Sequence, residues 1–301
     1  MIGAPLEPVE EEPLEEPAGH RTWRALRVNP SFWIGAFLVT GVVFVALFAP
    51  WLAPHNPDQP FPNGISAIGA PLGHTAKFPF GTDTEGRDLL SRLLFGARLS
   101  LTISLSGNAL AVLIGVGLGA AAAWWRGALE VIIMRLTDVM LAFPALLLAL
   151  AIVAIRGPSL TVIIVVIGMV SWTGLCRITY GQVLSYRERE WVDAARATGL
   201  SSLRILLRHI LPHLLAPIVV YATLGVGLTV VFEGSLNYLG LGVPDPTASW
   251  GRMINQGASA PLQFYWLVLY PSLALFVTVL GFNMLGDALR DALDPHGQLR
   301  R

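Results

Sequence analysis

The sequence predicts an all-α, polytopic membrane protein with six transmembrane helices. Of its 301 residues, 54% are hydrophobic and 13% are charged, whereas charged residues make up about 25% of an average soluble domain. Several uncharged stretches are also long enough to cross a hydrocarbon core of about 30 Å. These stretches are continuously apolar and lack the alternation of membrane β-barrel strands.

Each expected span lies between two charged residues. Five intervals qualify outright: Arg27 to Asp58, Arg98 to Arg126, Arg156 to Arg177, Arg208 to Glu233 and Arg252 to Asp287. The interval from Asp138 to Arg156 is shorter, and we count it as a span whose first turn carries Asp138. The six helices are expected to centre near Val43, Val112, Leu148, Val166, Gly225 and Phe276.

Charge balance and cysteine content exclude several classes of protein. The 20 Lys and Arg residues balance 20 Asp and Glu residues, so no net positive charge is present to attract nucleic acid. The single cysteine, Cys176, excludes a disulfide framework and a cysteine-rich metal site.

The distribution of Lys and Arg predicts that both termini lie in the cytoplasm. Cytoplasmic loops of membrane proteins carry an excess of these residues. With the N-terminus inside, the outer segments hold the minority of the 20, namely Lys77, Arg87, Arg92, Arg98, Arg156 and Arg252. An even number of spans then returns the chain to the cytoplasm.

Residues 1–28 are expected to form a disordered, acidic, proline-rich cytoplasmic tail. Glutamates alternate with prolines there, a composition that buries too little apolar surface to fold. The first hydrophobic run starts only near residue 31 and is not laid out as a signal peptide. It is therefore expected to be a retained membrane anchor.

Residues 29–98 are expected to hold this anchor, an outer loop and an interfacial helix. Gly81 and Gly86 suit turns, and from Asp88 onward the leucines fall on one helical stripe. We expect a helix at the membrane surface with its charges among the lipid headgroups. A catalytic role for the acidic residues of this segment is an alternative, but no histidine lies beside them.

The loop between the fourth and fifth spans predicts a helical elbow. Ser185 and Glu188 have the spacing of a capping box, so a cytoplasmic helix is expected to begin there. It should end at Gly199, because glycine tolerates the left-handed conformation that ends many helices. A second helix, Leu203–Leu211, is expected to follow and to be ended by Pro212.

Four interpretations of this elbow are open: a DNA-binding helix-turn-helix, a metal site on His209 and His213, a plain solvated loop, and a helix that docks on a cytoplasmic partner. The adjacent membrane spans argue against DNA binding. The metal site needs a third ligand and an unbroken helix. A plain loop would not need a capped helix and an elbow. A docking helix that transmits force to a cytoplasmic partner explains all the features.

Three motifs resemble those of permease subunits of bacterial ABC importers. Residues 193–199 and 209–212 resemble the EAA loop of these permeases. Residues 80–98 resemble the segment that precedes the permease core in the dipeptide, oligopeptide and nickel branch, and residues 233–251 resemble its second ("C") permease subunit. The matching residues of the outer motif include Gly81, Thr82, Asp83, Gly86, Arg87 and Asp88.

The resemblance implies a type I ABC importer permease fold in the bacterial cytoplasmic (inner) membrane. It implies a heterodimer with a second permease subunit, two ATPase subunits that bind ATP and Mg²⁺, and an extracellular or periplasmic substrate-binding protein. Residues 99–297 would form a five-helix core with a coupling loop at 182–212. The coupling residues implied by the match are Asp193, Ala194, Ala195, Arg196, Gly199, His209, Leu211 and Pro212.

Two positions depart from the general pattern of the EAA loop. Asp193 stands where the family usually has glutamate, which keeps the charge and shortens its reach. His209 replaces an aliphatic residue, as is common in this branch.

The chain lacks the phosphate-binding loop that it would need to bind ATP itself. That loop requires Gly-Lys followed by Ser or Thr, and the only lysine, Lys77, lies between Ala76 and Phe78. The chain is therefore expected to be no enzyme and to carry no cofactor of its own. A membrane-embedded enzyme or a scaffold protein stays open as an alternative, although the protease motifs of membrane enzymes are missing.

Polar residues within spans are candidates to line a pore, because they are costly when they face lipid. The candidates are Asn108, Asp138, Glu233 and Asn283. As alternatives, Asp138 pairs with Arg135, Glu233 lies near the outer mouth, and the asparagines bond neighbouring helices. The expected cargo is a di- or oligopeptide, with glutathione or a nickel chelate as alternatives.

Overall fold

The computed structural model describes residues 18–293, and the secondary structure elements of that part are all helices. By length and composition, five segments can cross a membrane, and a sharply bent pair of helices can form a sixth crossing. The five are α2 (Pro30–Leu52), α3 (Leu89–Trp125), α6 (Leu160–Arg187), α9 (Leu215–Tyr238) with the turns before it, and α11 (Trp266–Leu293). The all-α membrane fold is confirmed.

The sixth crossing is not one straight helix. It consists of α4 (Gly127–Ala142) and α5 (Ala145–Arg156), which meet at an angle of 91°. Pro144 causes the break, because proline disfavours helical geometry in the residue before it, and Phe143 is extended with φ −95° and ψ 140°. The expectation that Asp138 sits in the first turn of this span is wrong, since Asp138 belongs to the last turns of α4.

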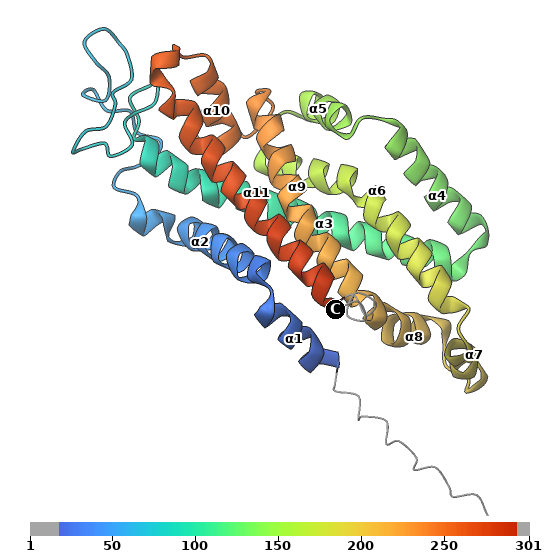
Figure 1. The fold of residues 1–301 in the computed structure, drawn as a ribbon. Helices are drawn as coiled ribbons and strands as arrows, with labels where there is room; N and C mark the ends of the chain where they lie inside the picture. The colour runs from blue at the N-terminus through green and yellow to red at the C-terminus, as the bar shows by residue number, and fades with distance from the viewer. Residues whose placement is uncertain (1–17, 294–301) are drawn as a thin grey trace, which may run out of the picture.

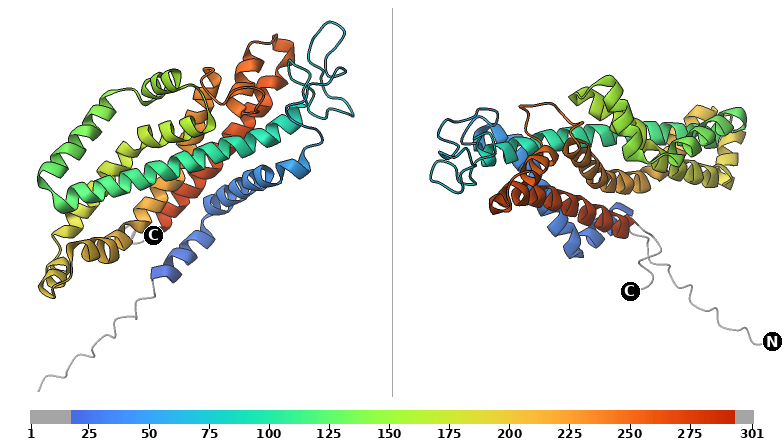
Figure 2. Two further views of the ribbon diagram at one scale, coloured as in Figure 1. Left: turned by 180° about the vertical axis from the view of Figure 1, so that it is seen from behind. Right: turned by 90° about the horizontal axis from the view of Figure 1, so that it is seen from above.

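Two ends of the bundle can be distinguished in Figures 1 and 2. At one end, here called the elbow end, lie α1 (Ala18–Val28), α7 (Glu190–Ala197), α8 (Ser202–Ile205) and the end of α11. At the opposite end, the loop end, residues 53–88 form an irregular segment beside α10 (Trp250–Ala258). The first and last described residues thus lie at the same end, as an even number of crossings requires.

Part of the expected tail, residues 1–28, is helical. Residues 1–17 lie outside the described residues, and Ala18–Val28 form helix α1, so the expectation of disorder is wrong for residues 18–28. The acidic and proline-rich composition ends at Pro17. Leu26 of α1 is buried, and the helix packs against α2 and α11, so these contacts with the bundle accompany its helical structure.

The separate interfacial helix is also an incorrect expectation. α3 begins at Leu89 and continues without interruption to Trp125, so the amphipathic segment is the first part of the second span, at the loop end. Asp88 caps it by accepting a hydrogen bond from the amide of Ser91 at 3.1 Å. Leu89, Leu93 and Leu101 lie buried in one cluster with residues of α9, α10 and α11. The apolar stripe therefore packs against the same group of helices along its length, and the helix continues without a break.

Among the described residues, the most extensive packing between two helices joins α3 to α6. Gly115 and Gly119 of α3 lie directly against the backbone of α6 and form a small-residue face there. Gly117 does not belong to that face, because a methyl group there would meet no atom within 4 Å.

Candidate functional site

The elbow that the sequence predicts is present, with a different start. Ser185 lies inside α6, which runs to Arg187, and α7 begins at Glu190 after the extended residue Arg189. The capping box is therefore a wrong interpretation, because the transmembrane helix simply continues past Ser185. The expected end is confirmed: Gly199 has φ +79°, a conformation that costs glycine little.

The second half of the elbow is also helical but does not stop at Pro212. α8 continues through a π-helical turn, Leu206–Ile210, and a 3-10 turn, Leu211–Leu214, directly into α9. Pro212 sits at the start of the 3-10 turn, where a missing amide hydrogen costs little. The expected break at Pro212 is therefore wrong, and the elbow continues as helical turns directly into α9, which is the fifth span when the bent pair is counted.

The apolar side of the elbow packs onto the ends of α3 and α6. Val192, the one fully buried residue of α7, shares a cluster with Trp124 of α3, Val183 of α6 and Ile205 of α8. Burying a side chain of this size contributes about 1.5–3 kcal/mol. α7 is thus held against the bundle by its own side chains.

Aromatic rings form a second connection between the elbow and the spans. The rings of Tyr186 and His213 are stacked with centroids 5.6 Å apart, and Trp191 lies 5.6 Å from His213. These three residues belong to the end of α6, to α7 and to the turn before α9. A displacement of α7 therefore acts on both adjoining spans.

The opposite side of the elbow is exposed. Asp193 pairs with Arg196 at 2.9 Å on the surface, and the Arg196 guanidinium lies 5.3 Å from the centre of the Trp124 ring. Leu203 and Leu207 are 52% and 53% exposed. An exposed helix followed by a glycine turn and exposed leucines is a surface on which another protein can dock.

The outer motif forms a buried ionic cluster at the loop end. The Asp83 carboxylate lies 2.7 Å from Arg87 Nε and 3.2 Å from Arg92 Nε. All three side chains are buried, and Arg92 also donates to the carbonyls of Pro57 and Pro246 at 3.0 and 3.2 Å. The expectation that these charges lie among lipid headgroups is wrong. They connect the irregular segment to α3 and to the loop before α10.

Further bonds from the same motif hold the irregular segment in shape. Thr82 Oγ1 donates to the carbonyl of Gly64 at 2.6 Å and accepts from the amide of Leu72 at 2.8 Å. Ser91 Oγ, which donates to Asp88, accepts from the amide of His55 at 3.1 Å. The motif is thus a structural clamp, and none of its contacts indicates catalysis.

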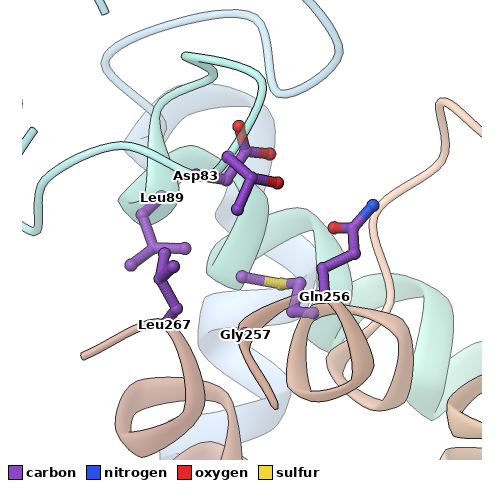
Figure 3. A pocket seen from close by; sticks show the side chains of 7 residues that line it. Asp83, Leu89, Gln256, Gly257 and Leu267 are labelled. Carbon is purple, nitrogen blue, oxygen red and sulfur yellow. The ribbon is translucent and has the colours of Figure 1, made fainter. Parts of the chain in front are cut away.

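The turns of the motif need glycine. Gly81 and Gly86 have φ +80° and +77°, and a Cβ at Gly81 would lie 2.5 Å from the Leu72 carbonyl oxygen. Their expected role in turns is confirmed. Asp83 and Leu89 also line a small pocket with Gln256, Gly257 and other residues of α10 and α11 (Figure 3).

Two of the four pore candidates lie against glycines of α9. Asn108 Nδ2 donates to the Ala222 carbonyl at 2.8 Å, and its Oδ1 occupies the space that a Cβ at Gly225 would need. Asn283 of α11 similarly lies against Gly227. Their positions fit the alternative in which asparagines bond or pack neighbouring helices.

Glu233 and Asp138 have partners of their own. Glu233 is buried in α9 and accepts from Asn237 Nδ2 at 2.6 Å, while Asn237 Oδ1 accepts from the amide of Val243. Asp138 accepts from Arg177 of α6 at 2.5 Å and lies 4.0 Å from Arg135. Both partners that hold these acids most closely, Asn237 and Arg177, are residues that sequence analysis missed as site residues. An arginine at the edge of an apolar run was the available signal for Arg177.

The packing role of Asn108 can be measured. We expect Asn108→Ala to lower the free energy of unfolding in detergent by about 1 kcal/mol, because interhelical hydrogen bonds in membranes contribute about 0.6–2 kcal/mol. Thr102→Ala is the control, since Thr102 bonds only the Arg98 carbonyl of its own helix. Equal losses in the two variants would contradict the cross-helix role.

The metal-site interpretation receives no support from the geometry. Between residues 18 and 293, no group of three or more His, Cys, Asp and Glu side chains is placed to hold a metal ion. His213 instead stacks on Tyr186.

Two family models match the chain. Residues 18–70 match the N-terminal transmembrane domain of oligopeptide transport permease C. Residues 111–296 match the inner membrane component of binding-protein-dependent transport systems. The second match covers the elbow and most of the membrane spans.

Individual relatives agree along nearly the whole chain. The di/tripeptide transport system permease protein DppC of Pseudomonas aeruginosa is 41% identical over 91% of this chain and 90% of its own length. The dipeptide transport system permease protein DppC of Alkalihalophilus pseudofirmus is 39% identical over 91% and 88%. The glutathione transport system permease protein GsiD of Escherichia coli is 38% identical over 92% and 90%.

These matches identify a family of transport permeases without an ATPase domain. A permease of this kind works in complex with other transporter subunits. The enzyme alternative is therefore set aside. The chain belongs to the inner membrane permease components of binding-protein-dependent transport systems and is a multi-pass, oligopeptide-permease-C-type subunit of a bacterial ABC importer.

Proposed function

We propose that this subunit forms one half of the translocation pore of an ATP-driven importer of di- or oligopeptides. The observation that carries the proposal is the exposed elbow, α7 to α8, which continues rigidly into α9. A partner that moves the elbow moves a transmembrane helix with it, because no flexible segment lies between them.

The proposed coupling surface faces a cytoplasmic ATPase subunit, one of two in the complex, which binds ATP and Mg²⁺. Its residues are Asp193, Ala194, Ala195, Arg196, Gly199, His209, Leu211 and Pro212, supported by the exposure of most of them. Ala195 and Leu211 are less exposed, because both pack partly against the cluster around Val192. The elbow end is accordingly the cytoplasmic end, as the arginine distribution also favours.

The other half of the pore is proposed to come from a second permease subunit, and cargo from an extracellular or periplasmic substrate-binding protein. Peptide is the favoured cargo because two of the relatives named above are dipeptide or di/tripeptide permeases. Glutathione is the second candidate, since a glutathione permease matches over an equal part of the chain. A nickel chelate is kept as a third outcome of the transport assay.

Coupling is tested with Gly199→Asp. A side chain at Gly199 would meet no atom within 4 Å, so the fold tolerates it apart from strain at φ +79°. In the proposed complex, however, it would insert a carboxylate between α7 and the ATPase. We expect ATP-driven uptake of a labelled dipeptide by membrane vesicles to be lost, together with co-purification of Walker-motif ATPases.

Gly69→Asp is the matched control for this experiment. Gly69 has φ +74° and equally open space, but it lies in the irregular segment at the loop end (Figure 1). The control should retain uptake and co-purification. Loss of uptake in both variants, or in neither, would contradict coupling through the elbow, and uptake of glutathione but not dipeptide would change the assigned cargo.

A further inference from the structure

An ion pair joins α4 to α6 within the membrane-spanning part of the chain. Arg177 Nη2 donates to Asp138 Oδ1 at 2.5 Å, and the two side chains are 52% and 47% exposed in this subunit. Both residues belong to segments that can cross a membrane by length and composition, Asp138 to the bent pair of α4 and α5 and Arg177 to α6. Charged groups in such segments face water or protein rather than lipid.

The helix break next to this ion pair must also face water or protein rather than lipid. Phe143 and Pro144 are exposed and non-helical, and they follow Asp138 within two helical turns. Irregular backbone does not occur against hydrocarbon, because its polar groups would have no partners. Figures 1 and 2 show α4 and α5 as an arc at the edge of the bundle, beside α6.

The surface of α6 around Arg177 is small and polar. Ser171, Gly174 and Gly181 are exposed at helical spacing on either side of it. A methyl group at Gly174 or Gly181 would meet no atom within 4 Å. By contrast, Val165 and Met169, which are exposed on another side of α6 nearer its start, are apolar, as expected of a surface that faces lipid. We call the polar surface, with Asp138 and the break at 143–144, the ion-pair face.

We propose that the ion-pair face lines the translocation pathway and that Arg177 binds the carboxylate of the cargo as it passes, while Asp138 holds the guanidinium in place. This inference rests on the proposed function. Asp138 engages Nη2, and a guanidinium has five N–H donors. The exposed N–H groups of Arg177 can therefore donate to a second carboxylate, in the bidentate geometry that suits arginine.

Burial of this face against the second permease is the competing outcome. In that case Arg177 would serve only the ion pair, and any arrangement that preserves the pair would preserve transport. If Arg177 binds cargo, transport depends on the arginine being on α6, and an arrangement that preserves only the pair does not preserve transport.

The first test compares variants in reconstituted complexes with the binding protein at saturation. Arg177→Gln should lower the maximal rate of dipeptide uptake about tenfold or more, the loss expected of one charge-assisted hydrogen bond. The charge exchange Asp138→Arg with Arg177→Asp restores the pair, and we expect it to assemble like the wild type but not to recover uptake. Full recovery of uptake by the exchange, or unchanged uptake with Arg177→Gln, would overturn the inference.

Solvent access supplies a second readout that does not depend on transport. Cys176 is the only cysteine and is buried, so Gly174→Cys in a Cys176→Ala background places one reporter on the ion-pair face. A membrane-impermeant thiol reagent should label it, and peptide should slow the labelling. Leu113→Cys, at a position 72% exposed among apolar residues of α3, is the unlabelled control.

The two proposals can fail separately. If the wild-type complex takes up none of the candidate cargoes, the proposed function fails and the inference with it. If the wild type transports and Gly174→Cys is labelled no faster than Leu113→Cys, only the inference is overturned.

Discussion

Replacing Asp83 with alanine is expected to unfold the loop end of the protein. Asp83 is the carboxylate closest to both Arg87 and Arg92, and all three side chains are buried. Removing one partner of a buried ion pair costs about 3–5 kcal/mol, because the remaining charge stays in a poorly solvated site. Here two arginines lose their partner, and Asp83 Oδ1 also accepts hydrogen bonds from the backbone amides of Glu85 and Arg87 at 2.9 Å.

Two measurements would detect this loss. Thermal unfolding of the purified subunit complex should shift to lower temperature, and limited proteolysis should cleave within residues 53–88. Glu85→Ala is the matched control: Glu85 also pairs with Arg87, at 2.8 Å, but is half exposed, and such pairs contribute about 0–1 kcal/mol. If the two variants lost equal stability, the cluster would not be the clamp that we describe.

Several parts of this fold could be predicted from the sequence because they depend on local composition. The spans centred near Val43, Val166 and Phe276 coincide with α2, α6 and α11, since an uninterrupted apolar run has few other ways to satisfy its backbone in a membrane. Gly199 was also predictable, because the end of a helix at glycine is decided by one residue and its φ angle.

Other features depend on contacts that are distant in sequence. Ser185 has the spacing of a helix cap, but the apolar contacts of Val183 and Tyr186 with the elbow keep α6 helical through it. Arg92 reads as an interfacial residue, whereas it reaches Pro246, far along the chain. No local pattern records that contact, and therefore neither the burial of the charges nor the clamp could be predicted.

The candidate site shows the same division. The exposed elbow was predictable from its helix signals, but its rigid continuation into α9 was not. Proline at 212 usually ends a helix, and here the π-helical and 3-10 turns accommodate it. For Asp138, the sequence suggested Arg135 as the partner one turn away, whereas the shorter contact is to Arg177 on another helix.

A methyl group at Gly119 is expected to force α3 and α6 apart. Its Cβ would lie 2.4 Å from the Cys176 carbonyl oxygen and 3.0 Å from Thr179 Cβ. The first of these is a backbone atom of a helix and cannot rotate away. Overpacking of this kind costs about 1–3 kcal/mol and occasionally more, so Gly119→Ala should lower the stability of the subunit. The larger side chain of Gly119→Leu should prevent assembly of a stable subunit.

Gly117→Ala is the matched control on the same helix, because its methyl group would meet no atom within 4 Å. Alanine also has the higher helix propensity, by about 1 kcal/mol, so this variant should be as stable as the wild type or more stable. The comparison is made by thermal unfolding in detergent and by the yield of monodisperse protein. Because α6 leads into α7, Gly119→Ala should also weaken uptake, whereas Gly117→Ala should not. Equal stability and equal uptake of Gly119→Ala and Gly117→Ala would show that α3 and α6 do not meet at Gly119.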